Sequence, residues 1–282
     1  MVTKIKNIRI KGKHKKPILV DVFYEDDRKQ KPVVIFCHGY KGFKDWGAWD
    51  LVGEEFAKSG IFFVKFNFSY NGGTLEEPID FPDLEAFGQN TFIKELDDLE
   101  TVIDWITSNS FSYQNQINSS KISLIGHSRG GGIAIIKAAE DTRITKLITW
   151  ASVSDYKNRF PKGEVFERWK KEGVFFIENG RTKQQMPHYF SFYTSFVENE
   201  GRLTIGNATK QIKAPHLIVH GVNDPTVLVN EAKQLHFWNP NSELFLLEEA
   251  NHVFGAKHPW DKHHLPKDLA IITLKTIEFV IV

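Results

Sequence analysis

Short apolar stretches alternate along the chain with longer amphipathic stretches, from about residue 17 to the C-terminus. Several of the short stretches are apolar almost throughout, which is typical of strands buried on both faces of a sheet. The pattern predicts strands at 17–25, 32–39, 61–70, 121–126, 146–152, 216–221 and 242–250. Because a helical pattern follows nearly every strand, we expect an α/β protein with a mostly parallel central sheet flanked by helices.

The amphipathic stretches predict helices at about 46–59, about 88–108, 130–140, about 228–237 and 266–282. The longest one repeats its apolar positions every 3.6 residues, so that Phe92, Leu96 and Leu99 share one face. The basic N-terminal segment 4–16 alternates lysine with isoleucine. We interpret it as an exposed edge strand whose lysines discourage pairing with other chains, rather than as a nucleic-acid-binding arm.

One long segment, residues 153–211, interrupts the alternation of strands and helices. It is too long for a loop in a compact domain and is rich in phenylalanine, tyrosine and tryptophan. We expect a helical cap inserted into a core domain that is formed by residues 1–152 and 212–282. Most of the aromatic side chains are expected to pack beneath the cap, and a few to line an acyl or aromatic pocket.

Composition narrows the classes of partner and compartment. The 36 basic and 35 acidic residues give a net charge of +1, so no nucleic-acid partner is expected. No segment approaches the roughly 20 apolar residues of a membrane span, and the N-terminus lacks the apolar run of a secretory signal. The single cysteine, Cys37, lies in an apolar strand and is expected to be an inert buried thiol. We therefore expect a cytoplasmic protein that does not associate with membranes.

Candidate chemistry begins with the stretch KISLIGHSRGGGIAII at residues 121–136. Ser128 lies between a predicted strand and a predicted helix, and Gly126 and Gly130 flank it at two residues on each side. A serine fits a sharp strand-to-helix turn only if its neighbours are small, which favours a nucleophile over a simple helix-capping serine. A phosphate-binding loop is disfavoured because the stretch matches neither the P-loop pattern nor GxGxxG.

A serine nucleophile needs a histidine base and an acid that orients it. Asp224 follows the strand predicted at 216–221, and His252 follows the strand predicted at 242–250. The carboxyl ends of parallel strands meet at one edge of a sheet, so these side chains are expected near Ser128. Two alternatives stay open: Asp224 could only cap its NDP turn, and Asp155, after an earlier strand, could be the acid.

The oxyanion of a tetrahedral intermediate needs two N–H donors. The backbone amide of Tyr40, in the segment HGYKGF, and the amide of Arg129, directly after the candidate nucleophile, are expected to supply them. His38 in the same segment is expected to form structural hydrogen bonds rather than to act as a second base.

Four segments together resemble the α/β-hydrolase superfamily: HGYKGF, GHSRGG, HGVNDPTV and ANHVF. They are similar to the oxyanion loop, nucleophile elbow, acid loop and histidine loop of dienelactone-hydrolase-like, feruloyl-esterase-like and acylaminoacyl-peptidase-like members. The order serine, aspartate, histidine is also that of the superfamily's catalytic triad. One departure is Leu228, where such acid loops often carry a proline. The resemblance implies an α/β-hydrolase fold with catalytic Ser128, Asp224 and His252.

The resemblance further implies a serine hydrolase that cleaves carboxylic esters of small to medium acyl substrates through an acyl-enzyme. A peptidase or amidase is the first alternative, although such peptidases usually carry a propeller domain for which 282 residues leave no room. The second is a non-catalytic binding protein on a hydrolase fold. No cofactor is expected, and His258, His263 and His264 lack the spacing of a zinc site. The oligomeric state stays open.

Overall fold

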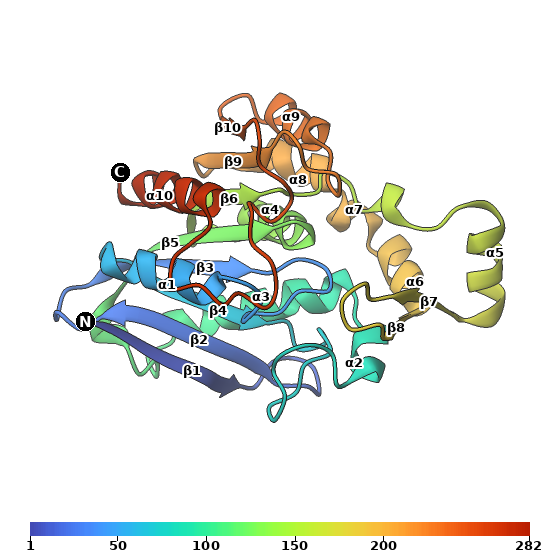
Figure 1. The fold of residues 1–282 in the computed structure, drawn as a ribbon, viewed down its shortest axis with the longest axis horizontal. Coiled ribbons are helices and arrows are strands. Elements are labelled where there is room, and N and C mark those ends of the chain that lie inside the picture. Colours follow the sequence, from blue (N-terminus) through green and yellow to red (C-terminus); the bar gives the residue numbers. More distant parts are fainter.

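The central element of the computed structural model, which describes residues 1–282, is an eight-stranded sheet (Figure 1). Its strand order is β1-β2-β4-β3-β5-β6-β9-β10. The bounds are β1 Val2–Ile10, β2 Ile18–Glu25, β3 Lys31–Cys37, β4 Phe62–Asn67, β5 Ile117–His127, β6 Ile144–Trp150, β9 His216–Gly221 and β10 Glu243–Leu247. Strands β1 and β2 pair antiparallel, as do β2 and β4, and every other pair is parallel. The expected mostly parallel sheet is therefore confirmed.

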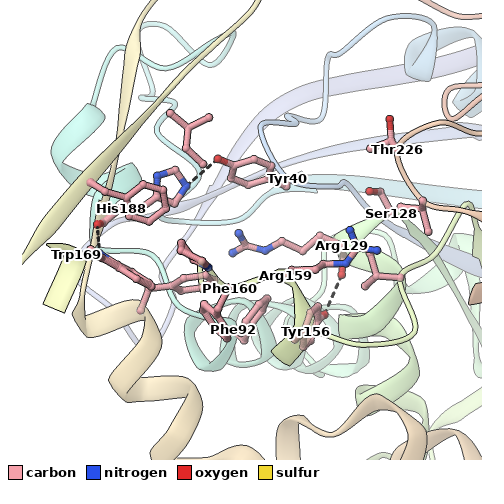
Figure 2. Close-up of a pocket in the computed structure, with 16 residues that line it drawn as sticks. Tyr40, Phe92, Ser128, Arg129, Tyr156, Arg159, Phe160, Trp169, His188 and Thr226 are labelled. Carbon is pink, nitrogen blue, oxygen red and sulfur yellow. Dashed lines mark hydrogen bonds between the residues drawn. The ribbon is translucent and has the colours of Figure 1, made fainter. Parts of the chain in front are cut away.

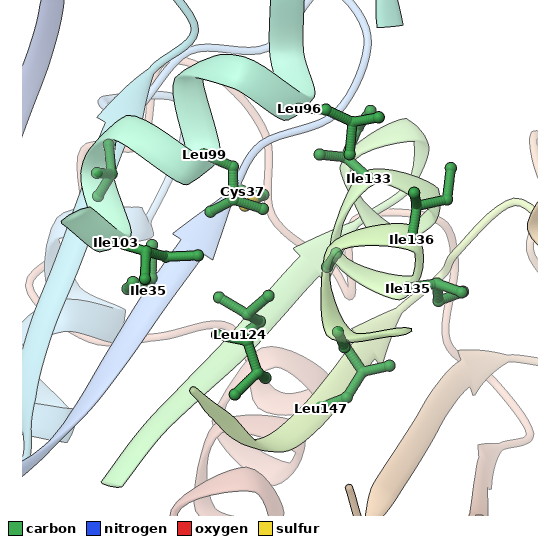
Figure 3. Close-up of a cluster of buried hydrophobic side chains, with 14 of the residues drawn as sticks. Ile35, Cys37, Leu96, Leu99, Ile103, Leu124, Ile133, Ile135, Ile136 and Leu147 are labelled. Carbon is green, nitrogen blue, oxygen red and sulfur yellow. The ribbon is translucent and has the colours of Figure 1, made fainter. Parts of the chain in front are cut away.

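Helices cover both faces of this sheet. Helices α1 (Trp49–Lys58) and α10 (Lys267–Ile281) pack on one face, whereas α3 (Phe92–Thr107), α4 (Arg129–Glu140), α8 (Ile205–Gln211) and α9 (Val229–Trp238) pack on the other. Successive residues of β3 point to opposite faces of the sheet, so Ile35 packs towards α3 and α4 while Phe36 packs towards α1. Figure 3 shows side chains of α3 and α4 packed against β3 and β5. This layering explains why the strands are apolar throughout.

The structure adjusts several predicted boundaries. The predicted helix at about 88–108 begins only at Phe92, because Thr91 caps it by accepting a hydrogen bond from the amide of Lys94. Residues Leu84–Gly88 form a separate short helix, α2, and a 3₁₀ turn at Gln114–Gln116 precedes β5. The basic N-terminal segment forms edge strand β1, as expected, but this strand ends at Ile10. None of the helices is both long and apolar enough to cross a membrane.

Most of the segment between β6 and β9 lies beyond the end of the sheet, where α5, α6, β7 and β8 are seen on the right in Figure 1. After a 3₁₀ turn at Lys157–Arg159 it contains α5 (Gly163–Glu172), β7 (Val174–Glu178), β8 (Gln185–Tyr189), α6 (Ser191–Glu198), α7 (Glu200–Leu203) and α8. Strands β7 and β8 pair as an antiparallel ribbon, which the expectation of a purely helical segment did not include. Gly173, with a φ of 78°, ends α5, and the β-branched and aromatic run after it forms β7.

Candidate active site

Ser128 occupies a sharp turn between β5 and α4. Its φ of 56° and ψ of −121° lie in a region that side-chain-bearing residues rarely adopt. The turn is held by its backbone, since the amide donates to the carbonyl of Trp150 (2.9 Å) and the carbonyl accepts from the amide of Gly131 (3.0 Å). Surrounding hydrogen bonds therefore maintain a strained backbone that presents the side chain at the end of the sheet.

The glycines around Ser128 are required by close backbone packing. A Cβ atom on Gly126 would lie 2.4 Å from the carbonyl oxygen of Gly130, and a Cβ on Gly130 would lie 2.4 Å from that of His38. A Cβ on Gly131 would lie 2.2 Å from Oγ of Ser152. Helix α4 can start directly above β3 and β6 only because these positions carry no side chain.

The structure brings Ser128, His252 and Asp224 together. His252 Nε2 lies 3.0 Å from Ser128 Oγ, and His252 Nδ1 lies 2.7 Å from Asp224 Oδ2. A carboxylate can only accept, so Nδ1 carries the proton and Nε2 is free to accept from the serine hydroxyl. The arrangement can move a proton from the serine to the imidazole.

Asp224 is buried, with 3% of its surface exposed, and both oxygens of its carboxylate accept hydrogen bonds. Its Oδ1 atom accepts from the amides of Thr226 (2.8 Å) and Val227 (2.9 Å). Burial acts to raise the pKa of this carboxyl, but hydrogen bonding by His220 and His252 holds the pKa well below its ordinary value. Asp224 therefore stays ionised beside the imidazole.

Two further histidines support this cluster, and the sequence patterns did not identify either. His127 Nε2 lies 2.9 Å from the carbonyl oxygen of His252, and burial together with the neighbouring His252 lowers its pKa to about 3. His220 Nε2 lies 2.8 Å from the carbonyl of Val227 and 3.5 Å from Asp224 Oδ2. His127 thus fixes the histidine loop and His220 the acid loop. Their position inside the segments GHSRGG and HGVNDPTV was the only signal in the sequence.

The amides of Tyr40 and Arg129 have no hydrogen-bond partner within the protein, so both can donate to a bound group. The loop of Tyr40 passes close to the serine, since a Cβ on Gly39 would lie 2.9 Å from Cβ of Ser128. His38 is buried, its Nδ1 lies 2.9 Å from the carbonyl of Gly39, and burial lowers its pKa to about 4. His38 therefore has the structural surroundings expected for it.

The other candidates from the sequence lie elsewhere. Asp155 accepts hydrogen bonds from the amides of Lys157 (2.6 Å) and Asn158 (3.2 Å), and these close its own turn. Cys37 is fully buried within β3, and burial raises the pKa of its thiol. Nδ1 of His258 lies 2.9 Å from the amide nitrogen of Gly47. None of these side chains hydrogen-bonds to Ser128, Asp224 or His252.

Two cavities meet at Ser128. The larger, of about 270 Å³, extends beneath the segment between β6 and β9 (Figure 2) and is lined by Tyr40, Phe92, Ser128, Arg129, Val153, Tyr156, Arg159, Phe160, Pro161, Trp169, Phe175, Ile177, His188, Phe192, Thr226 and Val227. The smaller, of about 120 Å³, is lined by His38, Gly39, Tyr40, Lys41, Gly42, Trp46, Trp49, His127, Ser128, His252 and Val253. Only Tyr40 and Ser128 line both cavities, so a ligand that spans them must pass the serine.

Two arginines line the larger cavity, Arg129 and Arg159, and the guanidinium of Arg129 is held next to the candidate nucleophile. Its Nε and Nη2 atoms donate to the buried carboxylate of Glu95, at 3.2 and 2.5 Å. The guanidinium carbon lies 4.9 Å from the ring centre of Phe92 and 5.1 Å from that of Phe192. Glu95 neutralises and orients the guanidinium, a contact between α3 and α4 that the sequence patterns did not indicate.

Comparison with known proteins places this fold in a family. The BD-FAE family model matches residues 20–238. Among solved structures, Est1E from Butyrivibrio proteoclasticus with ferulic acid bound is similar with a TM-score of 0.69 and 17% identity, over 97% of this chain and 98% of that chain. The esterase domain of a Rhodothermus marinus protein is similar with a TM-score of 0.62 and 14% identity, over 99% and 97% of the two chains.

An esterase from Pyrococcus furiosus is also similar, with a TM-score of 0.63 and 19% identity over 99% of this chain and 90% of that chain. No curated protein matches the sequence. The identities to the solved structures are low, so these structures establish the fold alone. The family match spans most of the chain, and the protein therefore belongs to the BD-FAE family within the α/β-hydrolase superfamily.

Proposed function

We propose that this protein is a serine esterase that cleaves carboxylic esters of small to medium acyl groups through an acyl-enzyme. The observation that carries the proposal is the chain of hydrogen bonds from Ser128 through His252 to the buried Asp224. Membership in the BD-FAE family and the esterases among the similar structures support ester hydrolysis in general.

The proposed reaction begins when Ser128 Oγ attacks the ester carbonyl carbon and His252 Nε2 accepts its proton. The amides of Tyr40 and Arg129 donate to the resulting oxyanion, where the N-terminus of α4 also favours negative charge. As the tetrahedral intermediate collapses, His252 returns the proton to the leaving alcohol oxygen. Water then attacks the acyl-enzyme with His252 as base, which releases the acid and restores the serine.

The lining of the two cavities sets the orientation in which an ester would bind. The leaving oxygen must lie next to His252 Nε2, and His252 lines the smaller cavity but not the larger. The acyl group therefore occupies the larger, aromatic cavity, and the alcohol the smaller one. A volume of about 270 Å³ is just below the roughly 300–1,000 Å³ of sites for drug-sized ligands, which suits a short chain or one aromatic acid. Ferulic acid bound to Est1E makes a feruloyl ester a natural test compound.

We further propose that residues 153–211 form a cap over the active site of a core domain made of residues 1–152 and 212–282. This segment supplies ten of the 16 residues around the larger cavity: Val153, Tyr156, Arg159, Phe160, Pro161, Trp169, Phe175, Ile177, His188 and Phe192. In this account, acyl preference depends on how the cap packs.

Steady-state kinetics on p-nitrophenyl acetate, p-nitrophenyl butyrate and methyl ferulate test the proposal. Ser128→Ala is expected to abolish hydrolysis, whereas the matched control Ser119→Ala changes an exposed serine of β5 and is expected to be neutral. Acyl p-nitroanilides distinguish an amidase, since faster cleavage of anilides than of esters would favour that alternative. Hydrolysis that survives in Ser128→Ala would contradict the mechanism, and no turnover by the wild type would favour a binding protein.

A further inference from the structure

The ribbon β7–β8 is tied to the loop that carries the Tyr40 amide. The hydroxyl of Tyr40 lies 2.7 Å from Nε2 of His188, which is on β8. Nδ1 of the same imidazole lies 3.0 Å from the carbonyl oxygen of Met186. A carbonyl can only accept, so Nδ1 carries the proton of the neutral ring and Nε2 accepts from the tyrosine. The direction of the contact is therefore set: Tyr40 donates and His188 accepts.

The imidazole of His188 is held as a rigid acceptor. It stacks on the ring of Phe175 with centres 4.9 Å apart, and the ring of Phe87 lies edge-on at 5.6 Å. The carbonyl of His188 accepts from the indole N–H of Trp169 at 2.7 Å (Figure 2). Burial, together with the charges of Arg129 and Lys41, lowers its pKa to about 4, which keeps the ring neutral near pH 7.

The next residue of the loop is tied to the other strand of the ribbon. The ammonium of Lys41 donates to the carbonyl of Glu178, on β7, at 3.1 Å. The backbone of Lys41 has a φ of 53°, so the loop turns sharply just after Tyr40. Two consecutive loop residues thus bond to both strands of the ribbon, from positions more than 130 residues away in sequence.

We propose that His188 is a positioning residue that orients the backbone amide of Tyr40 through the tyrosine hydroxyl, an inference that rests on the proposed esterase function. In this proposal Tyr40 has two roles, since its unpaired amide belongs to the loop beside Ser128 while its side chain is anchored on the ribbon. Donors that are oriented before the reaction stabilise the oxyanion without reorganising. The inserted segment therefore completes the oxyanion hole as well as lining the acyl cavity.

This role predicts a specific kinetic pattern. An interaction that acts only in the transition state lowers kcat and leaves KM nearly unchanged. Complete removal of an oxyanion donor costs roughly 10²–10³-fold in kcat, so a misaligned amide is expected to cost about tenfold. Because both side chains act through one hydrogen bond, removing either should have the same effect as removing both.

A double-mutant cycle on the full chain tests this with p-nitrophenyl acetate, whose acyl group is too short to reach far into the cavity. Tyr40→Phe and His188→Leu are each expected to lower kcat about tenfold with KM changed less than about twofold, and the double variant to be no slower than either. His188→Gln, which retains an acceptor, should restore part of kcat. Phe176→Leu, at a 56% exposed residue of β7, is the matched control and should match the wild type.

A second readout uses a boronic acid, which forms a tetrahedral adduct with a serine nucleophile. The two single variants are expected to bind it about tenfold more weakly, while affinity for the carboxylic acid product stays the same. Independent, multiplying effects on kcat, or a rise in KM at constant kcat, would overturn the inference and make His188 a simple cavity wall. A wild type without any esterase activity would overturn the proposed function, and the inference with it.

Discussion

Asp98 on α3 is a buried carboxyl without a cationic partner, and replacing it should change how stability depends on pH. It is 1% exposed, and Oδ2 accepts from the amide of Ser69 at 2.7 Å and from its hydroxyl at 2.9 Å. Burial, reinforced by the charges of Glu95 and Asp97, raises its pKa from 3.8 to about 7, against the hydrogen bonds from Ser69. Between about pH 4 and about pH 7, the folded protein therefore keeps Asp98 protonated whereas the unfolded chain releases this proton.

The sign of the effect follows from this difference. A group with a raised pKa in the folded state contributes its full stability below the unfolded pKa and loses it as pH rises through the folded pKa. The whole shift of about 3 pKa units corresponds to about 4 kcal/mol, of which about 3 kcal/mol is lost between about pH 5 and about pH 8. In Asp98→Asn the side chain cannot ionise, so this loss should disappear.

Urea unfolding of the wild type and Asp98→Asn at several pH values measures the effect. The stability of the variant relative to the wild type should rise by about 3 kcal/mol from about pH 5 to about pH 8. Asp104→Asn on the same helix is the control, because that side chain is 54% exposed and its ion pair with Arg143 lies at the surface, where such pairs contribute little to stability. Equal pH profiles for Asp98→Asn and the wild type would refute the reasoning.

The remaining predictions concern the site directly. Asp224→Asn should lower kcat for p-nitrophenyl esters by about 10³–10⁴-fold, because the amide cannot fix the histidine tautomer. It should also lower the free energy of unfolding near pH 7, because the fold stabilises the ionised carboxylate. A kcat close to that of the wild type would exclude a catalytic role for Asp224. Gly130→Ala should lower the free energy of unfolding by about 2 kcal/mol or more, since its Cβ would lie 2.4 Å from a backbone oxygen, whereas Gly201→Ala in open space should be neutral or slightly stabilising in the same melts. Ile177→Trp should narrow the larger cavity and lower kcat/KM for long acyl esters relative to acetate. Phe176→Trp, on the opposite face of β7, should leave this ratio unchanged. Equal ratios in the two variants would show that the acyl group does not bind in the larger cavity.

The fold was predictable because each strand carries its own local signal. Periodicity and turn chemistry are properties of neighbouring residues, so the sheet and the positions of Ser128, Asp224 and His252 at strand ends could be inferred from short segments. Side-chain contacts between elements that are distant in the sequence leave no comparable pattern in neighbouring residues. Glu95 binds Arg129 across α3 and α4, and His188 meets Tyr40 across 148 positions.

The ribbon within residues 153–211 was missed for a related reason. Its first strand, Val174–Glu178, is only five residues long and none of them is fully buried, so neither length nor alternation distinguished it from the aromatic helices around it. The left-handed conformation of Gly173 ends α5 there, but a lone glycine in an aromatic-rich sequence is weak evidence for a strand. Tertiary packing against Tyr40 and α2 decides the local structure.

Covalent labelling of the nucleophile tests the central claim most directly. Intact-protein mass spectrometry after reaction with a fluorophosphonate probe, followed by peptide mapping, locates the modified residue. The proposed mechanism predicts a single adduct on Ser128, its absence in Ser128→Ala and much slower formation in His252→Ala, because the imidazole must accept the serine proton. A wild type that forms no adduct, or an adduct that persists in Ser128→Ala, would contradict the claim.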